Sequence, residues 1–395
     1  MRIIRIVLMP LILFSVYSPL TATLIDFYKK GTIKVVLSKD IDNSTNWEDL
    51  FYDLNKELAI APDGSIFVSN SSQHNIFKFN ENGKFIKKFG QKGQGPGDYI
   101  RPGDLSILDN KYLVIGEYAA NRRISLFDLN GKFIKVLKAN HSVFRATALK
   151  DNKIAFLTYK YGSEKELPKK FKTIVIIKDA GSGNENEIDS FDIQDKGSLR
   201  IGDTSSIKFG NHIGEVLISR TKNGRLLVGV SNIPYLKIYS LNGKLIHSFL
   251  LNITPAPVTA NYIEKFKDDI LNKMRGKSVS RRKPAPKWLV NKLERVSFST
   301  LFGEHLPYYR EVLVDSEGNI LVFKWNDCIG GCDEIFQVYS PDGKYICETK
   351  IDKGAFDFKI DSKIKNIVFT SKGIFGLFQL KNSEDVSLRL VKIDI

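Results

Sequence analysis

The sequence predicts an all-β fold, a six-bladed β-propeller with four-stranded blades, and three observations carry this prediction. One hairpin phrase occurs four times: an aromatic residue, a polar turn ending in Asn-Gly or Asp-Gly, a Lys, an aromatic residue or Leu, and then Ile. A second series of turns, each followed by a short apolar strand, occurs six times. In four units the two turn types alternate, as expected for four strands joined by hairpins. Repetition of one such unit along a chain is typical of radially arranged blades.

Both turn series have the chemistry of β-hairpins, because Asn-Gly and Asp-Gly supply the positive φ angles that tight turns need. No such Asn-Gly-Lys hairpin lies between Tyr159 and Asp195, in the outer half of the third blade. The four copies of the phrase are Phe79–Ile86, Phe127–Ile134, Tyr239–Ile246 and Tyr339–Ile346, and the six turns of the other series begin at Asp63, Asp109, Asp151, Asn223, Glu317 and Lys372.

The two ends of the chain predict how the ring closes. The last turn is followed by only two apolar strands, Ile374–Leu380 and Val386–Ile393, so the last blade lacks its outermost strand. Thr32–Leu37 is a strand that precedes the first complete blade. An unpaired sheet edge is a liability, so we expect this N-terminal strand to close the last blade of a single propeller domain over residues 31–395. The alternative is a loose N-terminal arm.

Residues 252–306 interrupt the repeat between the fourth and fifth blades. Apolar residues at helical spacing predict one helix within Asn261–Arg275, and a second helix is expected to begin at Pro286. We expect this helical insertion to be a cap or a partner-binding element; the alternative is an insertion that packs against the side or base of the ring. Its linker carries a basic tip of Arg281, Arg282 and Lys283.

The N-terminus predicts export. Met1–Arg5 is positively charged, Ile6–Tyr17 is apolar, and small or polar residues follow, so residues 1–23 are expected to form a secretory signal peptide. An uncleaved anchor is the alternative, because Ile3–Ile25 is almost long enough to span a bilayer. In both cases the propeller is expected to be secreted or periplasmic, with membrane contact only through an uncleaved N-terminus.

The formal net charge of +15 indicates the class of partner. In an exported protein this charge favours an envelope or extracellular protein or an anionic glycan, and not nucleic acid. The alternative is that the lysines are spread over solvated strand faces. We expect a monomer.

Three cysteines are present. Cys328 and Cys332 flank a Gly-Gly pair in a predicted hairpin loop, and in an oxidising compartment they are expected to form a disulfide. A metal site is the alternative. Cys347 is then left as a free, buried thiol.

The string from Phe89 to Asp98, Phe-Gly-Gln-Lys-Gly-Gln-Gly-Pro-Gly-Asp, resembles the Gly-rich loop that joins one NHL blade to the next. Together with the repeated phrases, it makes the mature chain similar to secreted six-bladed propellers of the NHL-repeat type, within the wider group that includes TolB-like propellers. The resemblance implies the fold but not the activity, because such propellers include scaffolds, binding proteins, lyases and lactonases.

Two sets of polar residues are candidate site residues. His141, His212 and His305 precede Asn152, Asn223 and Glu317 by 11, 11 and 12 residues, which places them near one mouth of the channel. Three imidazoles there could bind zinc or another divalent metal, as in amidating lyases with similar propellers; the alternative is that the spacing arises by chance. The second set leads into the inner strand of blade two, where it is expected to bind a ligand or to form structural ion pairs: Asp98, Arg101 and Asp104.

These features favour a noncatalytic exported propeller that binds a protein or glycan partner through one face and the helical insertion. The alternative is a metal-dependent lyase or hydrolase acting at the mouth of the central channel. A structural component of the cell envelope, held by an uncleaved N-terminus, is a third hypothesis. The sequence contains no G-x-S-x-G, H-E-x-x-H or phosphate-loop motif to indicate another enzyme.

Overall fold

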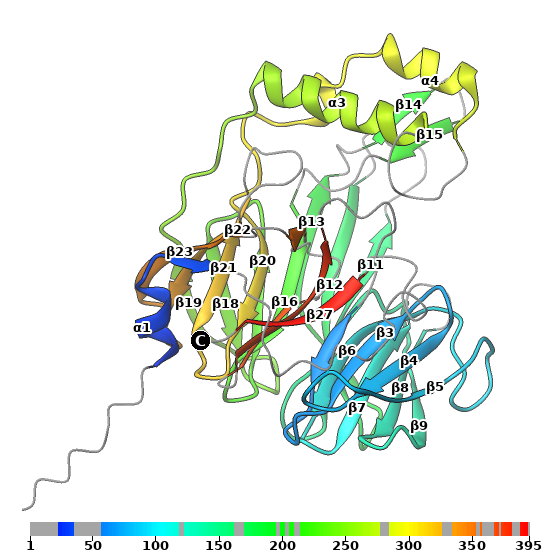
Figure 1. Ribbon diagram of the computed structural model, residues 1–395, viewed down its shortest axis with the longest axis vertical. Helices are drawn as coiled ribbons and strands as arrows, with labels where there is room; N and C mark the ends of the chain where they lie inside the picture. Colours follow the sequence, from blue (N-terminus) through cyan, green and yellow to red (C-terminus); the bar gives the residue numbers. More distant parts are fainter. Residues whose placement is uncertain are drawn as a thin grey trace, which may run out of the picture.

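The computed structural model describes residues 23–34, 57–117, 122–161, 170–194, 198–201, 205–208, 214–276, 284–325, 334–352, 356–357, 367–370, 373–380 and 388–393. They form a six-bladed β-propeller, whose first five blades each contain four antiparallel strands in chain order (Figure 1). The strands are β2 (Leu58–Ile60), β3 (Ile66–Asn70), β4 (Asn75–Phe79) and β5 (Phe85–Phe89) in blade one; β6 (Pro102–Leu108), β7 (Tyr112–Glu117), β8 (Arg123–Asp128) and β9 (Phe133–Lys138) in blade two; β10 (Arg145–Ala148), β11 (Lys153–Tyr161), β12 (Lys170–Asp179) and β13 (Glu185–Gln194) in blade three; β16 (Val216–Arg220), β17 (Leu226–Val230), β18 (Tyr235–Tyr239) and β19 (Leu245–Leu250) in blade four; and β20 (Tyr309–Val314), β21 (Ile320–Lys324), β22 (Glu334–Tyr339) and β23 (Tyr345–Asp352) in blade five.

Each repeated phrase forms the hairpin between the two outer strands of a blade, as predicted. The turn glycine has a positive φ in all four copies, for example +76° at Gly131. This glycine is also close to the preceding blade, because a methyl group added at Gly131 would lie 2.7 Å from Cδ1 of Phe89. The turn glycines of blades four and five lie in the same way against Ile188 and Phe249. The phrase therefore serves both the hairpin and the contact between blades.

The sixth blade is built around β26 (Gly373–Leu380). Its outer edge pairs with β27 (Leu388–Ile393), and its inner edge pairs with two short strands, β24 (Phe356–Asp357) and β25 (Ile367–Thr370). Within the described residues this blade is therefore three strands wide, because β24 and β25 lie one after the other along the same edge of β26.

The N-terminal strand joins a C-terminal sheet, as predicted, but the prediction that it closes the last blade is wrong. Strand β1 (Thr32–Lys34) pairs in parallel with β23 and becomes a fifth strand of blade five. Helix α1 (Leu24–Tyr28) is the physical reason. The Tyr28 hydroxyl donates to Asp315 Oδ2 at 3.0 Å, and the Thr349 hydroxyl donates to the Tyr28 carbonyl at 2.6 Å. These buried contacts hold the segment against blade five.

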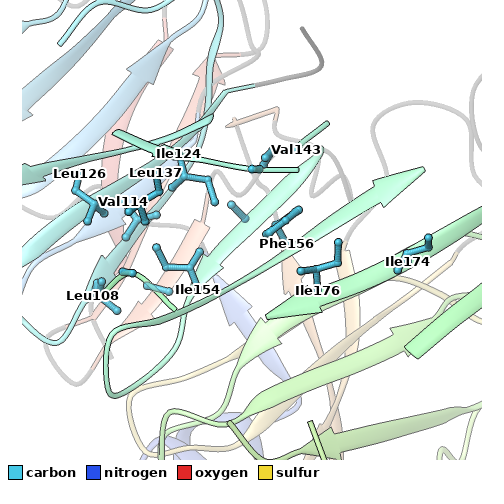
Figure 2. Packing of buried hydrophobic residues seen from close by; sticks show 14 residues of the cluster. Leu108, Val114, Ile124, Leu126, Leu137, Val143, Ile154, Phe156, Ile174 and Ile176 are labelled. Carbon is cyan, nitrogen blue, oxygen red and sulfur yellow. The ribbon is translucent and has the colours of Figure 1, made fainter. Parts of the chain in front are cut away.

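The ring is closed by apolar packing between consecutive blades. Among the described residues, six clusters of buried side chains each join two neighbouring blades. One of these clusters joins the last blade to the first, because Phe375 of blade six packs with Ile66 and Phe79 of blade one. Figure 2 shows the cluster between blades two and three, where Val114 and Ile124 face Ile154 and Phe156. Burial of this kind is the main stabilising contribution to a propeller.

The predicted helical insertion lies between blades four and five. It contains α3 (Ala260–Met274), α4 (Lys287–Glu294) and the short 3₁₀ helix η1 (Ser299–Leu301), and Figure 1 shows α3 and α4 at one end of the molecule. The insertion has its own apolar core, which includes Phe266, Leu293 and Phe302. Trp325, directly after β21, packs against that core and connects it to blade five.

A two-stranded hairpin that the repeats did not predict, β14 (Ser198–Ile201) and β15 (Ser205–Lys208), lies between blades three and four. In the part of the chain that the structure describes, no helix is both long and apolar enough to cross a membrane.

Candidate functional site

The inner strands carry charged residues towards the centre of the ring. The inner strand of each of the first five blades is followed by a hairpin. The closing residue of this hairpin, residue i, pairs with residue i+4 through a backbone hydrogen bond or as a strand partner. Four positions before that closing residue, four of the five blades carry a buried charged residue and blade four carries the buried Leu217; the charged residues are Glu57, Asp104, Arg145 and Glu311. Arg145 Nη2 lies 3.4 Å from Glu311 Oε2, although their blades, three and five, are not neighbours. The ion pair therefore crosses the centre of the ring.

The three polar residues that were predicted to bind a ligand near blade two differ in burial and in surroundings. Asp104 is buried, and its Oδ2 accepts a hydrogen bond of 2.8 Å from the backbone of Ala146, which ties inner strands two and three together. Asp98 lies against its own loop at Gly93 and Gly95, and Arg101 is exposed. Asp104 thus has a structural contact, and ligand binding by the three residues stays a prediction.

The Gly-rich loop after β5 connects two blades, as the sequence indicated. Arg123 fixes it: its guanidinium donates to the Glu117 carboxylate and to the carbonyls of Gln94 and Asp98. Arg123 and Glu117 are both buried. The loop is therefore organised from inside by a buried charged pair.

The predicted histidine site is only partly described. His141 and His305 are exposed, on the segments that lead into the third and fifth inner strands. His212 lies outside the described residues. Among the residues that the structure describes, no group of three or more His, Cys, Asp and Glu side chains is placed to hold a metal ion. Zinc binding by the three histidines stays a prediction.

Five other predicted site residues lie outside the described ranges. These are the basic tip, Arg281, Arg282 and Lys283, and the cysteine pair, Cys328 and Cys332. Cys347 is a free thiol, but it is half-buried rather than buried. Burial raises the pKa of this thiol.

A cavity of about 790 Å³ lies at the end of the ring where the inner strands finish and their hairpin turns begin. All six blades line it, through the last residues of their inner strands and the adjoining turns. The helical insertion adjoins the beginning of inner strand five, so the insertion and the cavity lie at opposite ends of the channel. The lining of the cavity combines polar and apolar groups. The polar groups are hydroxyls, the guanidinium of Arg220, the Lys222 amine and the carboxylates of Glu81 and Asp315, and the apolar groups include Leu313, Phe369 and Phe375.

Arg220 is the unexpected member of this lining. Equivalent positions in the other four aligned blades carry Ile60, Ile107, Ala148 and Val314. Arg220 is half-buried, and its Nη1 donates to the Ile107 carbonyl at 2.9 Å. Burial lowers its pKa, but an arginine side chain stays charged in proteins. Aligning the inner strands by their turns would have revealed this residue in the sequence.

The helical insertion is a second candidate surface, because it concentrates positive charge. Residues 252–306 contain eleven Lys and Arg and five Asp and Glu, a formal charge of +6 in 55 residues. Trp288 on α4 has 64% of its surface exposed. Three basic residues around it are also exposed: Lys287, Lys292 and Arg295.

Comparisons with known proteins concern the fold. A protein from Bacteroides fragilis, named as a putative exported protein, is 13% identical with a TM-score of 0.49, and the match covers 92% of this chain and 99% of that one. A member of the DUF4221 family from Bacteroides vulgatus has the same identity, TM-score and coverage of this chain, with 98% of its own length covered. Virginiamycin B lyase from Staphylococcus aureus is 10% identical with a TM-score of 0.40, over 86% of this chain and 84% of that one. No curated protein sequence matches the chain.

One family model matches part of the sequence. It is DUF5128, described as a 6-bladed beta-propeller, and it covers residues 56–212, which contain the first three blades and the β14–β15 hairpin. The ring of six blades and this match agree: the chain is a six-bladed β-propeller.

Proposed function

We propose that this protein is an exported, noncatalytic propeller that binds an acidic protein partner through its helical insertion. Export rests on the signal-peptide pattern of residues 1–23. The observation that carries the proposal is the distribution of charge. The insertion holds 55 of 395 residues but +6 of the formal net charge of +15.

The insertion has the structure expected of a binding element. Its helices pack around a core of their own, so they present a defined surface and not a loose loop. Tyr262 and Phe266 contact Phe302 at ring-centroid distances of 5.7 and 5.3 Å, which anchors α3. A rigid element loses little conformational entropy when a partner binds.

The exposed face of α4 combines the two features that protein interfaces use most. Trp288 offers a large apolar side chain, and tryptophan is enriched among residues that dominate binding energy. Lys287, Lys292 and Arg295 surround it with positive charge, which steers an acidic partner towards the surface. An acidic protein with an apolar pocket would match both features.

The proposal is tested by site-specific photocrosslinking in cells that make the full chain. A photoreactive phenylalanine analogue replaces Asn291, which is exposed one helical turn from Trp288. The matched control places the same analogue at Asn130, an exposed residue in the outer hairpin of blade two. We expect one acidic protein to be crosslinked at position 291 and not at position 130. A glycan adduct at position 291, or the same adducts at both positions, would contradict the proposal.

A further inference from the structure

The cavity at the turn end of the ring has features that the proposed partner interaction does not use. It is lined by all six blades, and its volume of about 790 Å³ lies in the range of small-molecule sites, roughly 300–1,000 Å³. It lies at the opposite end of the channel from the insertion. A ligand in this cavity would therefore leave the insertion accessible.

The cavity contains a cation without a balancing carboxylate contact. Among the residues that the structure describes, Arg220 forms no ion pair, and its hydrogen bond to the Ile107 carbonyl engages only Nη1. The negative charge of Asp109 raises the pKa of Arg220, but the two oxygens of Asp109 accept hydrogen bonds from the backbones of Asp151 and Asn152. Removing a guanidinium from water is unfavourable unless an acceptor replaces the water.

Hydroxyl groups accompany this guanidinium. Ser219 and Thr221 from blade four, Ser106 from blade two and Thr147 from blade three line the same cavity, and the Thr221 hydroxyl already donates to the Arg225 carbonyl at 3.4 Å. Ser106 Oγ accepts a hydrogen bond from Ala148, so its own proton can be donated elsewhere. A guanidinium with several hydroxyl donors is suited to an oxyanion, which accepts hydrogen bonds at several oxygens.

The lining also includes Lys222 and two carboxylates, Glu81 and Asp315. Both oxygens of Asp315 already accept hydrogen bonds, Oδ1 from the backbones of Gly318 and Asn319 and Oδ2 from the Tyr28 hydroxyl.

Part of the lining is apolar. Phe369 and Phe375 from blade six and Leu313 from blade five line the same cavity. A small inorganic anion would not use this surface, whereas an organic anion with an apolar body would cover it and lose water from it.

From this combination we infer that the cavity binds a small organic oxyanion. Its charged group is held by Arg220 and the hydroxyls, and its apolar body lies against Phe369, Phe375 and Leu313. The position of Arg220 matters, because the other four aligned blades carry Ile60, Ile107, Ala148 and Val314 there. A side chain of that apolar kind would satisfy the packing of the ring, so the guanidinium is explained by a ligand.

The test uses anilinonaphthalene sulfonate, a fluorescent sulfonate with an apolar aromatic body, on the purified full chain. The variants are Arg220→Met, which removes the charge, and Arg220→Lys, which keeps it but loses the planar fork. The matched control is Arg225→Met, an exposed arginine on the far side of the same hairpin. Circular dichroism verifies that each variant is folded, and Arg220→Lys remains informative if Arg220→Met does not fold.

We expect stoichiometric binding to the wild type and to Arg225→Met. Binding should weaken about ten-fold or more in Arg220→Met and to a smaller extent in Arg220→Lys, the range expected for charge-assisted hydrogen bonds. The neutral analogue phenylnaphthylamine should bind wild type and Arg220→Met alike. Octanoate or octyl phosphate, but not octanol, should displace the probe, and their rank distinguishes a carboxylate from a phosphate ligand.

Three results would overturn the inference. They are no stoichiometric binding to the wild type, equal affinities for wild type and folded Arg220 variants, and failure of both octanoate and octyl phosphate to compete. None of these results bears on crosslinking at position 291, so this inference and the proposed partner interaction can fail separately.

Discussion

Replacement of Gly131 by Ala separates the two demands that the repeated phrase places on its glycine. The first is backbone conformation: φ is +76° at Gly131, and an L-residue held in the left-handed region costs roughly 1–2 kcal/mol. The second is space, because the new Cβ would lie 2.7, 2.9 and 3.0 Å from Cδ1, Cε1 and Cγ of Phe89. Phe89 cannot easily move away, since its ring packs against Phe127 and Phe67 at centroid distances of 5.3 and 6.4 Å.

Gly183 is a matched control for the conformational cost alone. Its φ is +82°, and no atom lies within 4 Å of an added Cβ. We expect Gly183→Ala to destabilise the protein by about 1 kcal/mol, because part of the backbone strain is offset by the lower entropy of the unfolded chain. Gly131→Ala carries the same cost plus an overpacking cost of about 1–3 kcal/mol, for a total of about 3 kcal/mol.

The assay is urea unfolding of both variants and the wild type, followed by far-UV circular dichroism. Midpoints should fall for both variants with unchanged slopes, and the fall should be two- to three-fold larger for Gly131→Ala. Equal losses in the two variants would show that the contact with Phe89 adds nothing to the requirement for glycine.

Three more predictions concern single contacts. Arg145→Met should cost about 3–5 kcal/mol in urea unfolding, because it leaves a carboxylate buried at the ring centre; adding Glu311→Leu should recover most of the loss, and no recovery would contradict a direct pair. Tyr28→Phe should cost about 1–3 kcal/mol and expose the N-terminal segment to limited proteolysis; unchanged cleavage would argue against the docked helix. The hydrogen bond from Lys153, followed by backbone donors, lowers the pKa of Asp179 to about 2. Its stabilising contribution is therefore full above the ordinary carboxyl pKa of about 4 and lost as the pH falls through about 2, so wild type and Asp179→Asn should differ slightly at pH 7 and converge near pH 2; a constant difference would exclude this linkage.

Much of the fold was predictable because it is determined by local turn chemistry. Asn-Gly and Asp-Gly dictate positive φ at fixed places, and these places locate the hairpins and count the blades. The helical insertion was predictable from apolar periodicity and from Pro286 at its second helix.

The partner of the N-terminal strand was not predictable in this way. The edge argument indicated that β1 needs a partner but did not identify which blade provides it. The choice depends on tertiary contacts over almost the whole chain, such as the hydrogen bond from Tyr28 to Asp315. A pattern of short-range signals contains no information about such a contact.

The two candidate sites, the insertion and the cavity, differ for the same reason in how far the sequence predicts them. The charge of the insertion is visible in the sequence, so the insertion was predicted as a binding element. The exposed face of α4 was not predicted, because apolar spacing placed Trp288 on the buried side of the helix, whereas 64% of its surface is exposed. Arg220 looks like an ordinary strand residue until the inner strands of five blades are aligned by their turns, which shows that equivalent residues are apolar. Its role depends on six segments converging on one cavity, and only the closed ring brings them together.

We propose that positive charge on the insertion, and not the net charge of the protein, binds the partner. The decisive measurement compares the affinity of the protein captured at position 291 for two triple variants with the same change in net charge. We predict a loss of about ten-fold or more when three basic residues of the insertion become Glu, and little loss when three turn lysines of the ring become Glu. Equal losses in the two variants would contradict the claim. The positions are Lys287, Lys292 and Arg295 in the insertion and Lys84, Lys132 and Lys244 in the ring.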